Sequence, residues 1–112
     1  MSKYKLLIIF FSLFILIGCS KEKENIQLIR ETNQKVEMIS AYKKGMDLIE
    51  VNDYFAAGKK FLEAEILFPQ SQWASKSVLM ASYSYYMQDY YSLAISNLKR
   101  YFDTYPKDKN KA

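Results

Sequence analysis

The chain has no histidine, one cysteine, two prolines and three glycines among its 112 residues. The absence of histidine removes the commonest general base and the commonest metal ligand. A single cysteine cannot form a disulfide within the chain, so packing alone must hold the fold. Because glycine and proline break helices, their scarcity in a chain rich in Lys, Glu, Ala and Leu favours an all-α protein.

Strand patterns and strong charge are lacking as well. No stretch alternates apolar and polar residues in the way of a half-buried strand. The net charge is +4, and it falls to +2 without Lys3 and Lys5, with basic and acidic residues interspersed. This pattern argues against nucleic-acid binding. A chain of this length allows at most one small domain, without the size for a deep catalytic cavity.

The N-terminus carries an informative pattern. Lys3 and Lys5 precede an apolar run from Leu6 to Ile17, which one serine interrupts and which leads into Gly18-Cys19. A basic segment, a short apolar segment and small residues are typical of a secretory signal. The run is shorter than the ~20 residues that span a bilayer. The alternative is an uncleaved membrane anchor with a chance cysteine.

Leu16-Ile17-Gly18-Cys19 resembles a bacterial lipobox. The resemblance implies that residues 1–18 are removed, and that Cys19 carries a diacylglycerol and an N-terminal acyl chain. Two or more acyl chains bind a membrane firmly. Ser20 is not the aspartate associated with inner-membrane retention, so the resemblance implies the outer membrane of a Gram-negative bacterium. Residues 19–33 are then the lipidated cysteine, a charged tether and the start of a helix.

Apolar periodicity and turn residues predict four helices after the signal. We expect them at about 34–50, 54–67, 72–87 and 90–104, with Asp53, Ser71 and Asp89 as N-caps. On the first helix, three- and four-residue steps predict a buried face of Val36, Ile39, Tyr42, Lys43, Met46 and Ile49. On the second helix, the predicted face is Ala57, Phe61, Ala64 and Phe68.

The second pair of helices repeats the first at an offset of 37 residues. Asn52-Asp53-Tyr54 aligns with Asp89-Tyr90-Tyr91, and the same offset relates Ala57 to Ala94, Phe61 to Leu98 and Pro69 to Pro106. A repeat of this size indicates a helical solenoid. Its spacing resembles a tetratricopeptide repeat (TPR), which implies two TPR-like hairpins at about 38–71 and 75–108. Gly45 lies where that motif lets paired helices approach closely.

A second signature lies between the two units. It consists of Pro69-Gln70-Ser71-Gln72-Trp73-Ala74, then Leu79-Met80-Ala81-Ser82-Tyr83-Ser84-Tyr85-Tyr86, then Asp89-Tyr90. These segments resemble the BamD (ComL) family of outer-membrane assembly lipoproteins over about residues 40–109. Members of that family are longer and carry later repeats, which bind the POTRA region of the barrel-assembly protein. The early repeats are associated with receiving unfolded barrel proteins.

Tyrosines crowd residues 83–91 and form the candidate partner-binding site: Tyr83, Tyr85, Tyr86, Tyr90 and Tyr91. Tyrosine offers a large rigid area with a polar tip, which suits a groove that grips the aromatic-ended segment of a client barrel protein. Tyr85 is expected to be exposed. Packing between helix pairs is the alternative for each tyrosine. Trp73 is a further candidate anchor, and its alternative is packing at the corner after Pro69.

The sequence carries no catalytic set, because Gly-rich phosphate loops, Ser/His/Asp combinations and metal-ligand spacings are all missing. Glu63 and Glu65 lie two apart on a helix, so they point to different faces and cannot act as a paired acid and base. We therefore expect no enzymatic activity, no metal, no nucleic-acid partner, and no cofactor beyond the lipid on Cys19.

The resemblance implies a non-catalytic scaffold or receptor for the insertion of β-barrel proteins by the BAM complex, lipid-anchored on the periplasmic face of the outer membrane. Expected partners are the barrel-assembly machinery and unfolded outer-membrane proteins. One alternative is another repeat lipoprotein, acting in peptidoglycan or division maintenance. The other is a truncated fragment without independent function, because arrays usually need ~3 repeats. Its uncapped apolar end would lie near Tyr101 and Phe102.

Overall fold

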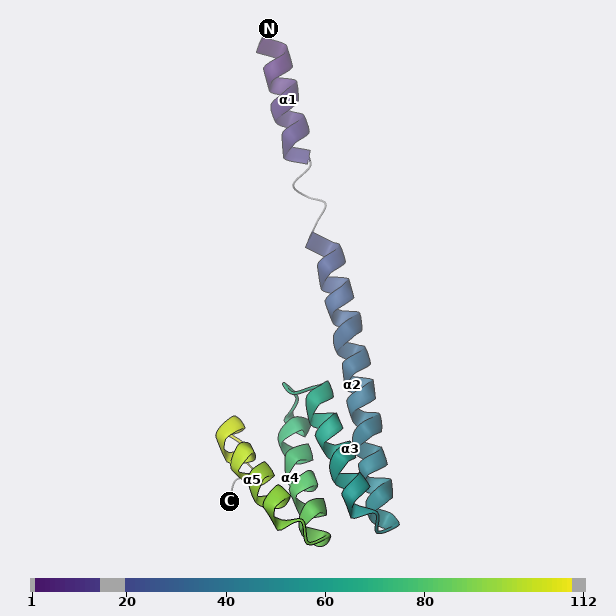
Figure 1. The fold of residues 1–112 in the computed structure, drawn as a ribbon. Coiled ribbons are helices and arrows are strands. Elements are labelled where there is room, and N and C mark those ends of the chain that lie inside the picture. Colours follow the sequence, from purple (N-terminus) through teal and green to yellow (C-terminus); the bar gives the residue numbers. More distant parts are fainter. Residues whose placement is uncertain (1, 15–19, 110–112) are drawn as a thin grey trace. The chain divides into compact units, whose positions relative to one another are not determined.

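The computed structural model describes residues 2–14 and 20–109, and every regular element in these ranges is an α-helix. The helices are α1 (Ser2–Phe14), α2 (Ser20–Glu50), α3 (Tyr54–Leu67), α4 (Gln72–Met87) and α5 (Tyr91–Thr104) (Figure 1). The predicted all-α class is confirmed. The chain divides after Thr32 into two units, which are described separately.

The N-terminal unit contains α1 and the first part of α2. No helix within the described ranges is long and apolar enough to cross a membrane. The expected cleavage and lipidation point at Gly18-Cys19 lies outside the described residues. The signal peptide and the lipid on Cys19 therefore stay predictions.

α2 begins at Ser20, so the segment expected to be a tether is helical instead. Residues 20–33 contain neither glycine nor proline and are rich in Lys, Glu and Gln, which have good helix propensity. The Gln27 amide donates to Glu31 across 3.5 Å, and the Thr32 hydroxyl donates to the Leu28 carbonyl across 2.9 Å. Helix propensity accounts for the early start of α2.

In the second unit, residues 33–112, α3 lies between α2 and α4, and α5 lies beside α4 (Figure 1). We call residues 33–67 the first hairpin and residues 72–104 the second hairpin. Each pairs two antiparallel helices through a short turn, which is the TPR-like arrangement predicted from the 37-residue repeat.

The turn inside each hairpin uses the same backbone conformation. Asn52 and Asp89, which are 37 residues apart, both have φ of 62°, a left-handed conformation that Asn and Asp tolerate better than other side chains. The Tyr54 hydroxyl donates to Asn52 Oδ1 at 3.3 Å, and the Tyr91 hydroxyl donates to Asp89 Oδ1 at 2.8 Å. The repeat therefore extends from sequence to turn geometry.

Two of the three predicted N-caps are confirmed. The Asp53 carboxylate accepts from the Ala56 N–H at 3.3 Å, and the Ser71 hydroxyl accepts from the Trp73 N–H at 3.1 Å. The prediction of Asp89 as a cap is wrong, because Tyr90 occupies the N-cap of α5 without a side-chain cap bond. Asp89 lies one residue earlier, in the left-handed turn.

The core forms where small residues let helices approach. Phe61 of α3 is fully buried, and a Cβ built on Gly45 of α2 would lie 2.8 Å from its ring. Gly58 of α3 stands in the same relation to Tyr85 of α4, at 2.9 Å. The predicted face residues Ala57 and Ala64 are buried as well, whereas Phe68, which follows the end of α3, is half-buried.

The predicted face of α2 is wrong in part. Met38, Ala41 and Gly45 point into the core, whereas Val36, Ile39, Lys43 and Met46 are exposed. The buried stripe also follows three- and four-residue steps, and its small residues Ala41 and Gly45 allow α3 to come close, while Met38 fills the core beside them. Tyr42 and Ile49 lie at its edge and are half-buried.

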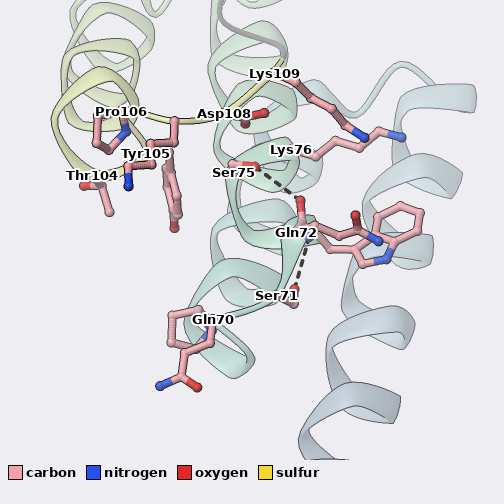
Figure 2. Close-up of a pocket in the computed structure, with 13 residues that line it drawn as sticks. Gln70, Ser71, Gln72, Ser75, Lys76, Thr104, Tyr105, Pro106, Asp108 and Lys109 are labelled. Atoms are coloured by element: carbon pink, nitrogen blue, oxygen red, sulfur yellow. Dashed lines mark hydrogen bonds between the residues drawn. The ribbon is translucent and has the colours of Figure 1, made fainter.

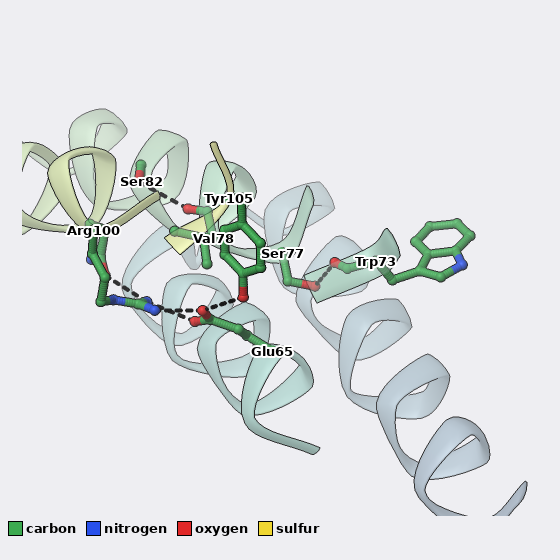
Figure 3. Close-up of polar contacts among 8 residues, drawn as sticks. Glu65, Trp73, Ser77, Val78, Ser82, Arg100 and Tyr105 are labelled. Atoms are coloured by element: carbon green, nitrogen blue, oxygen red, sulfur yellow. Dashed lines mark hydrogen bonds and ion pairs between the residues drawn. The ribbon is translucent and has the colours of Figure 1, made fainter. Parts of the chain in front are cut away.

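One polar cluster ties the two hairpins together. Glu63 and Glu65 point to different faces, as predicted. Glu63 is exposed and pairs with Lys60, whereas Glu65 is buried. Its carboxylate accepts from Arg100 Nη2 at 2.7 Å and from the Tyr105 hydroxyl at 2.8 Å (Figure 3). A buried carboxylate of the first hairpin is thus neutralised from the second.

Candidate interaction surface

The structure exposes most of the candidate tyrosines and brings several of them together. Tyr83 and Tyr86 lie one turn apart on α4 and are both exposed. The ring of Tyr83 packs edge-on against Tyr54 at 6.4 Å, and the ring of Tyr86 packs against Tyr91 at 5.6 Å. We call Tyr54, Tyr83, Tyr86 and Tyr91 the tyrosine surface.

The hydroxyls of this surface are partly fixed. Asp89 accepts the hydrogen bond of Tyr91, and that bond, together with the nearby negative charge, raises the pKa of Tyr91 above 10.0. The Tyr54 hydroxyl is bound to Asn52. Because these polar tips are engaged within the turns, the surface presents mainly ring area to a partner.

Tyr90 is exposed but does not belong to this surface. α4 ends at Met87, so Tyr90 does not continue the helix that carries Tyr83 and Tyr86. After the left-handed turn, the ring of Tyr90 lies 5.0 Å from Phe55 of α3. Tyr90 therefore covers the N-terminal part of α3.

The expectation that Tyr85 is exposed is wrong. Its side chain is 5% exposed and lies against Gly58, with its ring 5.8 Å from Phe55. Burial raises the pKa of the Tyr85 hydroxyl. Tyr85 shares the α3-facing side of α4 with Ala81 and Val78, so its role is packing between the hairpins.

Trp73 lies at the other end of α4 from the tyrosine surface. Ten residues separate it from Tyr83, which is about 15 Å along a helix. Its ring is 37% exposed, packs edge-on against Tyr42 of α2 at 5.2 Å, and has the Lys76 ammonium 4.9 Å from its centroid. A hollow of about 290 Å³ beside it is lined by Met38, Ile39, Tyr42, Lys43 and Met46. The candidate site thus separates into two surfaces.

A larger cleft, of about 770 Å³, separates the start of α4 from the segment that follows α5 (Figure 2). Ser71, Gln72 and Lys76 line one side, and Tyr105 and Lys109 line the other. The cleft is open to solvent, and part of the sequence signature between the two units, Pro69 to Trp73, lies in its lining. The described residues around it and elsewhere include no group of His, Cys, Asp and Glu able to hold a metal ion.

The sequence also failed to reveal an apolar groove between α4 and α5. It has a volume of about 530 Å³ and is lined by Leu79, Ser82, Tyr83, Tyr86, Tyr91, Ala94, Ile95 and Leu98. Three of these residues belong to the tyrosine surface. The 37-residue repeat could have indicated the groove, because Leu98 stands at the position of the buried Phe61.

Comparison with known proteins assigns the chain to a family. A family model described as YfiO, outer membrane lipoprotein, matches residues 34–112, which include both hairpins and all the aromatic residues above. The chain belongs to the YfiO family of outer-membrane lipoproteins. Because the match covers both hairpins, the TPR-like pair and its exposed tyrosines lie inside the YfiO region of the chain.

One similar protein carries a functional name. The outer membrane protein assembly factor BamD of Caulobacter vibrioides is 32% identical over 89 residues, which cover 80% of this YfiO chain and 28% of that protein. The chain therefore spans well under half of this relative's length. No solved structure matches the chain. The similarity confirms the BamD-like resemblance seen in the sequence.

Proposed function

We propose that this chain is an outer-membrane lipoprotein that acts as a non-catalytic scaffold or receptor in the assembly and insertion of β-barrel proteins. Membership of the YfiO family and similarity to a BamD support this class of function. The proposed partners are the barrel-assembly machinery and unfolded outer-membrane proteins. A triacylated Cys19 would hold the hairpins on the periplasmic face of the membrane.

The tyrosine surface is the observation that carries the receptor role. Tyr83, Tyr86 and Tyr91 present ring area on two packed helices, so a partner gains contact area without a large ordering cost. The Tyr91 hydroxyl is held by Asp89. Such a surface suits the aromatic-ended segment of a client barrel protein.

A binding titration tests the receptor role. The full chain, kept in detergent, is titrated with a peptide that ends in the aromatic terminal strand of a barrel protein. We expect saturable binding that weakens at least about tenfold in a Tyr83→Ala/Tyr86→Ala double variant, because aromatic anchors dominate such contacts. Ile66→Ala is the matched control, since Ile66 is an exposed apolar residue of α3 outside this surface. Equal affinity in all three proteins would contradict the role of the tyrosines.

The anchor needs a separate test. Mass measurement of the chain from a Gram-negative host should show loss of residues 1–18 and the added mass of three acyl chains. A Cys19→Ala variant should keep the intact N-terminus and carry no lipid. An unmodified Cys19 in the wild type would contradict the lipoprotein assignment.

A further inference from the structure

The first turns of α2 carry apolar side chains that the described part of the N-terminal unit leaves exposed. Ile26, Leu28 and Ile29 are 67%, 63% and 61% exposed. They belong to that unit, which ends at Thr32. A single exposed apolar residue needs no explanation, whereas three within four positions form a patch of the kind that marks an interaction site.

The three apolar side chains share one side of the helix. At 3.6 residues per turn they fall within an arc of about 160°. Asn25 and Thr32 share that arc and carry no charge, and the Thr32 hydroxyl is bound to a backbone carbonyl of the same helix. The opposite arc carries Gln27, Arg30 and Glu31, all exposed. Residues 25–32 are therefore an amphipathic segment.

This segment adjoins the proposed lipid anchor. α2 begins at Ser20, the residue after Cys19, so the helix starts directly at the expected site of acylation. Ile26 and Ile29 lie only about 9 and 14 Å along the helix from Ser20, at 1.5 Å per residue. The anchor therefore holds the apolar patch close to the membrane surface whichever way the helix points.

We propose that residues 25–32 lie flat on the membrane, with Ile26, Leu28 and Ile29 inserted between the lipid headgroups and the acyl chains. The inference rests on the proposed anchor at Cys19 and goes beyond it, because it makes the start of α2 a second membrane contact. A helix suits this place, since its backbone hydrogen bonds are satisfied internally. Amphipathic helices of low net hydrophobicity bind membranes in this way.

The anchor supplies what three apolar side chains lack by themselves. Once acyl chains hold the protein on the bilayer, contact of the segment with lipid is intramolecular, and the effective concentration of lipid is high. Apolar burial then has to offset only the ordering of a helix that is already formed. Arg30 lies one turn after Ile26, at the edge of the polar side, where its guanidinium can bind a lipid phosphate.

Position favours lipid over protein as the occupant of this patch. Acylation of Cys19 brings lipid within about 14 Å of all three apolar residues before any other partner is needed. A protein segment, whether a later part of the same polypeptide or another chain, would have to displace lipid from a patch held at the membrane surface.

A depth measurement tests the inference. Cys19 is the single cysteine of the chain, and acylation blocks its thiol, so an introduced cysteine alone takes a nitrobenzoxadiazole label. The acylated chain from a Gram-negative host carries the label at Ile29→Cys or, as the matched control, at Glu31→Cys. These positions differ by about 3 Å along the helix but lie on opposite sides of it.

The labelled proteins are placed in vesicles of phosphatidylethanolamine and phosphatidylglycerol that contain nitroxide lipids at two depths. The label at Ile29→Cys should be quenched from roughly 5–10 Å inside the headgroup boundary. The label at Glu31→Cys should lie farther out by about 10 Å, the diameter of a helix.

Substitutions elsewhere on the segment show what holds it down. Adding Ile26→Ser and Leu28→Ser to the Ile29→Cys protein should move its label toward water, because the apolar contact is lost. Ile66→Ser is the control, since Ile66 is an exposed apolar residue of α3 outside the segment, and it should leave the depth unchanged. Equal helical circular dichroism would show that the variants fold.

The outcomes separate this inference from the proposed function. Equal depths for the two labels overturn the inference, because they show a helix that points away from the membrane. A label at Ile29→Cys that is shielded from water but not quenched by lipid also overturns it, by showing that protein covers the patch. In both cases, three acyl chains found on Cys19 by mass leave the proposed anchor intact. A chain without acyl groups contradicts both.

Discussion

Arg100 of α5 donates two guanidinium hydrogen bonds to the carboxylate of the buried Glu65 of α3, so the second hairpin neutralises a charge in the first. Such bidentate pairs are stronger and more directional than single contacts. Tyr105 donates a further hydrogen bond to the same carboxylate (Figure 3). Glu65 lies 35 residues before Arg100 and 40 before Tyr105, so the cluster depends on the packing of the two hairpins.

Replacing Arg100 by methionine should lower the free energy of unfolding by about 1–3 kcal/mol, because a buried carboxylate loses its cation. The value lies below that of a fully buried pair, since the Arg100 side chain is 43% exposed. Urea unfolding measures the loss.

A Glu65→Gln/Arg100→Met double variant is the control. It should recover much of that loss, because a neutral amide in place of the Glu65 carboxylate no longer leaves a charge unpaired. Strictly additive effects of the two substitutions would show that the pair is not coupled.

The chain should lose stability as pH rises above 10.0. Burial raises the pKa of Tyr105 above its ordinary value of 10.0, with a smaller contribution from the hydrogen bond to Glu65. Above pH 10.0 the unfolded chain releases this proton while the folded chain retains it, so unfolding becomes more favourable. Below pH 10.0 both states hold the proton, and this residue gives no pH dependence.

Tyr105→Phe tests the origin of that slope. Between about pH 10 and 12, the unfolding free energy of the variant should fall less steeply with pH. The slope should be smaller by up to about the contribution of one proton released on unfolding. Denaturant titrations across this range measure the slope. Identical slopes in the two proteins would be inconsistent with the buried state of the Tyr105 hydroxyl.

Gly58→Ala should destabilise the chain by about 1–2 kcal/mol. The new methyl would lie 2.9 Å from the buried Tyr85 ring, and overpacking costs more than the gain in helix propensity. In a Tyr85→Leu background, the ring atoms that clash are gone, and the same substitution should be neutral or stabilising. Thermal melting of the four proteins gives the comparison.

Asp53→Ala should lower the free energy of unfolding by about 1 kcal/mol, because Asp53 caps α3.

Asp89→Asn should change the free energy of unfolding little, since Asp89 caps no helix and Asn also tolerates its φ of 62°. It should also lower the pKa of Tyr91, as the carboxylate that raises it is lost. Ultraviolet titration detects this shift, and an unchanged pKa of Tyr91 would contradict the contact.

The helix bounds were predictable where turn residues mark them. Asp53, Ser71 and Pro69 give α3 and α4 the bounds expected from the sequence. The prediction of Asp89 as a cap was wrong because Asp89 corresponds to Asn52 and not to Asp53. The cap position of α5 therefore holds a tyrosine, Tyr90. The sequence shows a repeat, but it does not show which of two adjacent polar residues forms the turn and which the cap.

The binding surfaces were harder to predict, because periodicity does not reveal which face of a helix has a neighbour. α4 contacts helices on two sides, so its tyrosines divide between the exposed Tyr83 and Tyr86 and the buried Tyr85. For the burial of Tyr85 the sequence offered a signal in Gly58, a glycine inside a helix that a close neighbour explains. Val36 and Ile39 misled because they are apolar and yet exposed.

Trp73 is the single tryptophan of the chain, and its ring lies at the junction of α2 and α4. Its intrinsic fluorescence therefore reports how the two hairpins are joined, whereas circular dichroism reports the helices themselves. If the hairpins separate before they unwind, tryptophan emission will shift to longer wavelength while the helical signal is still intact. The protein thus carries its own optical probe, without any added label, for distinguishing one cooperative unit from two.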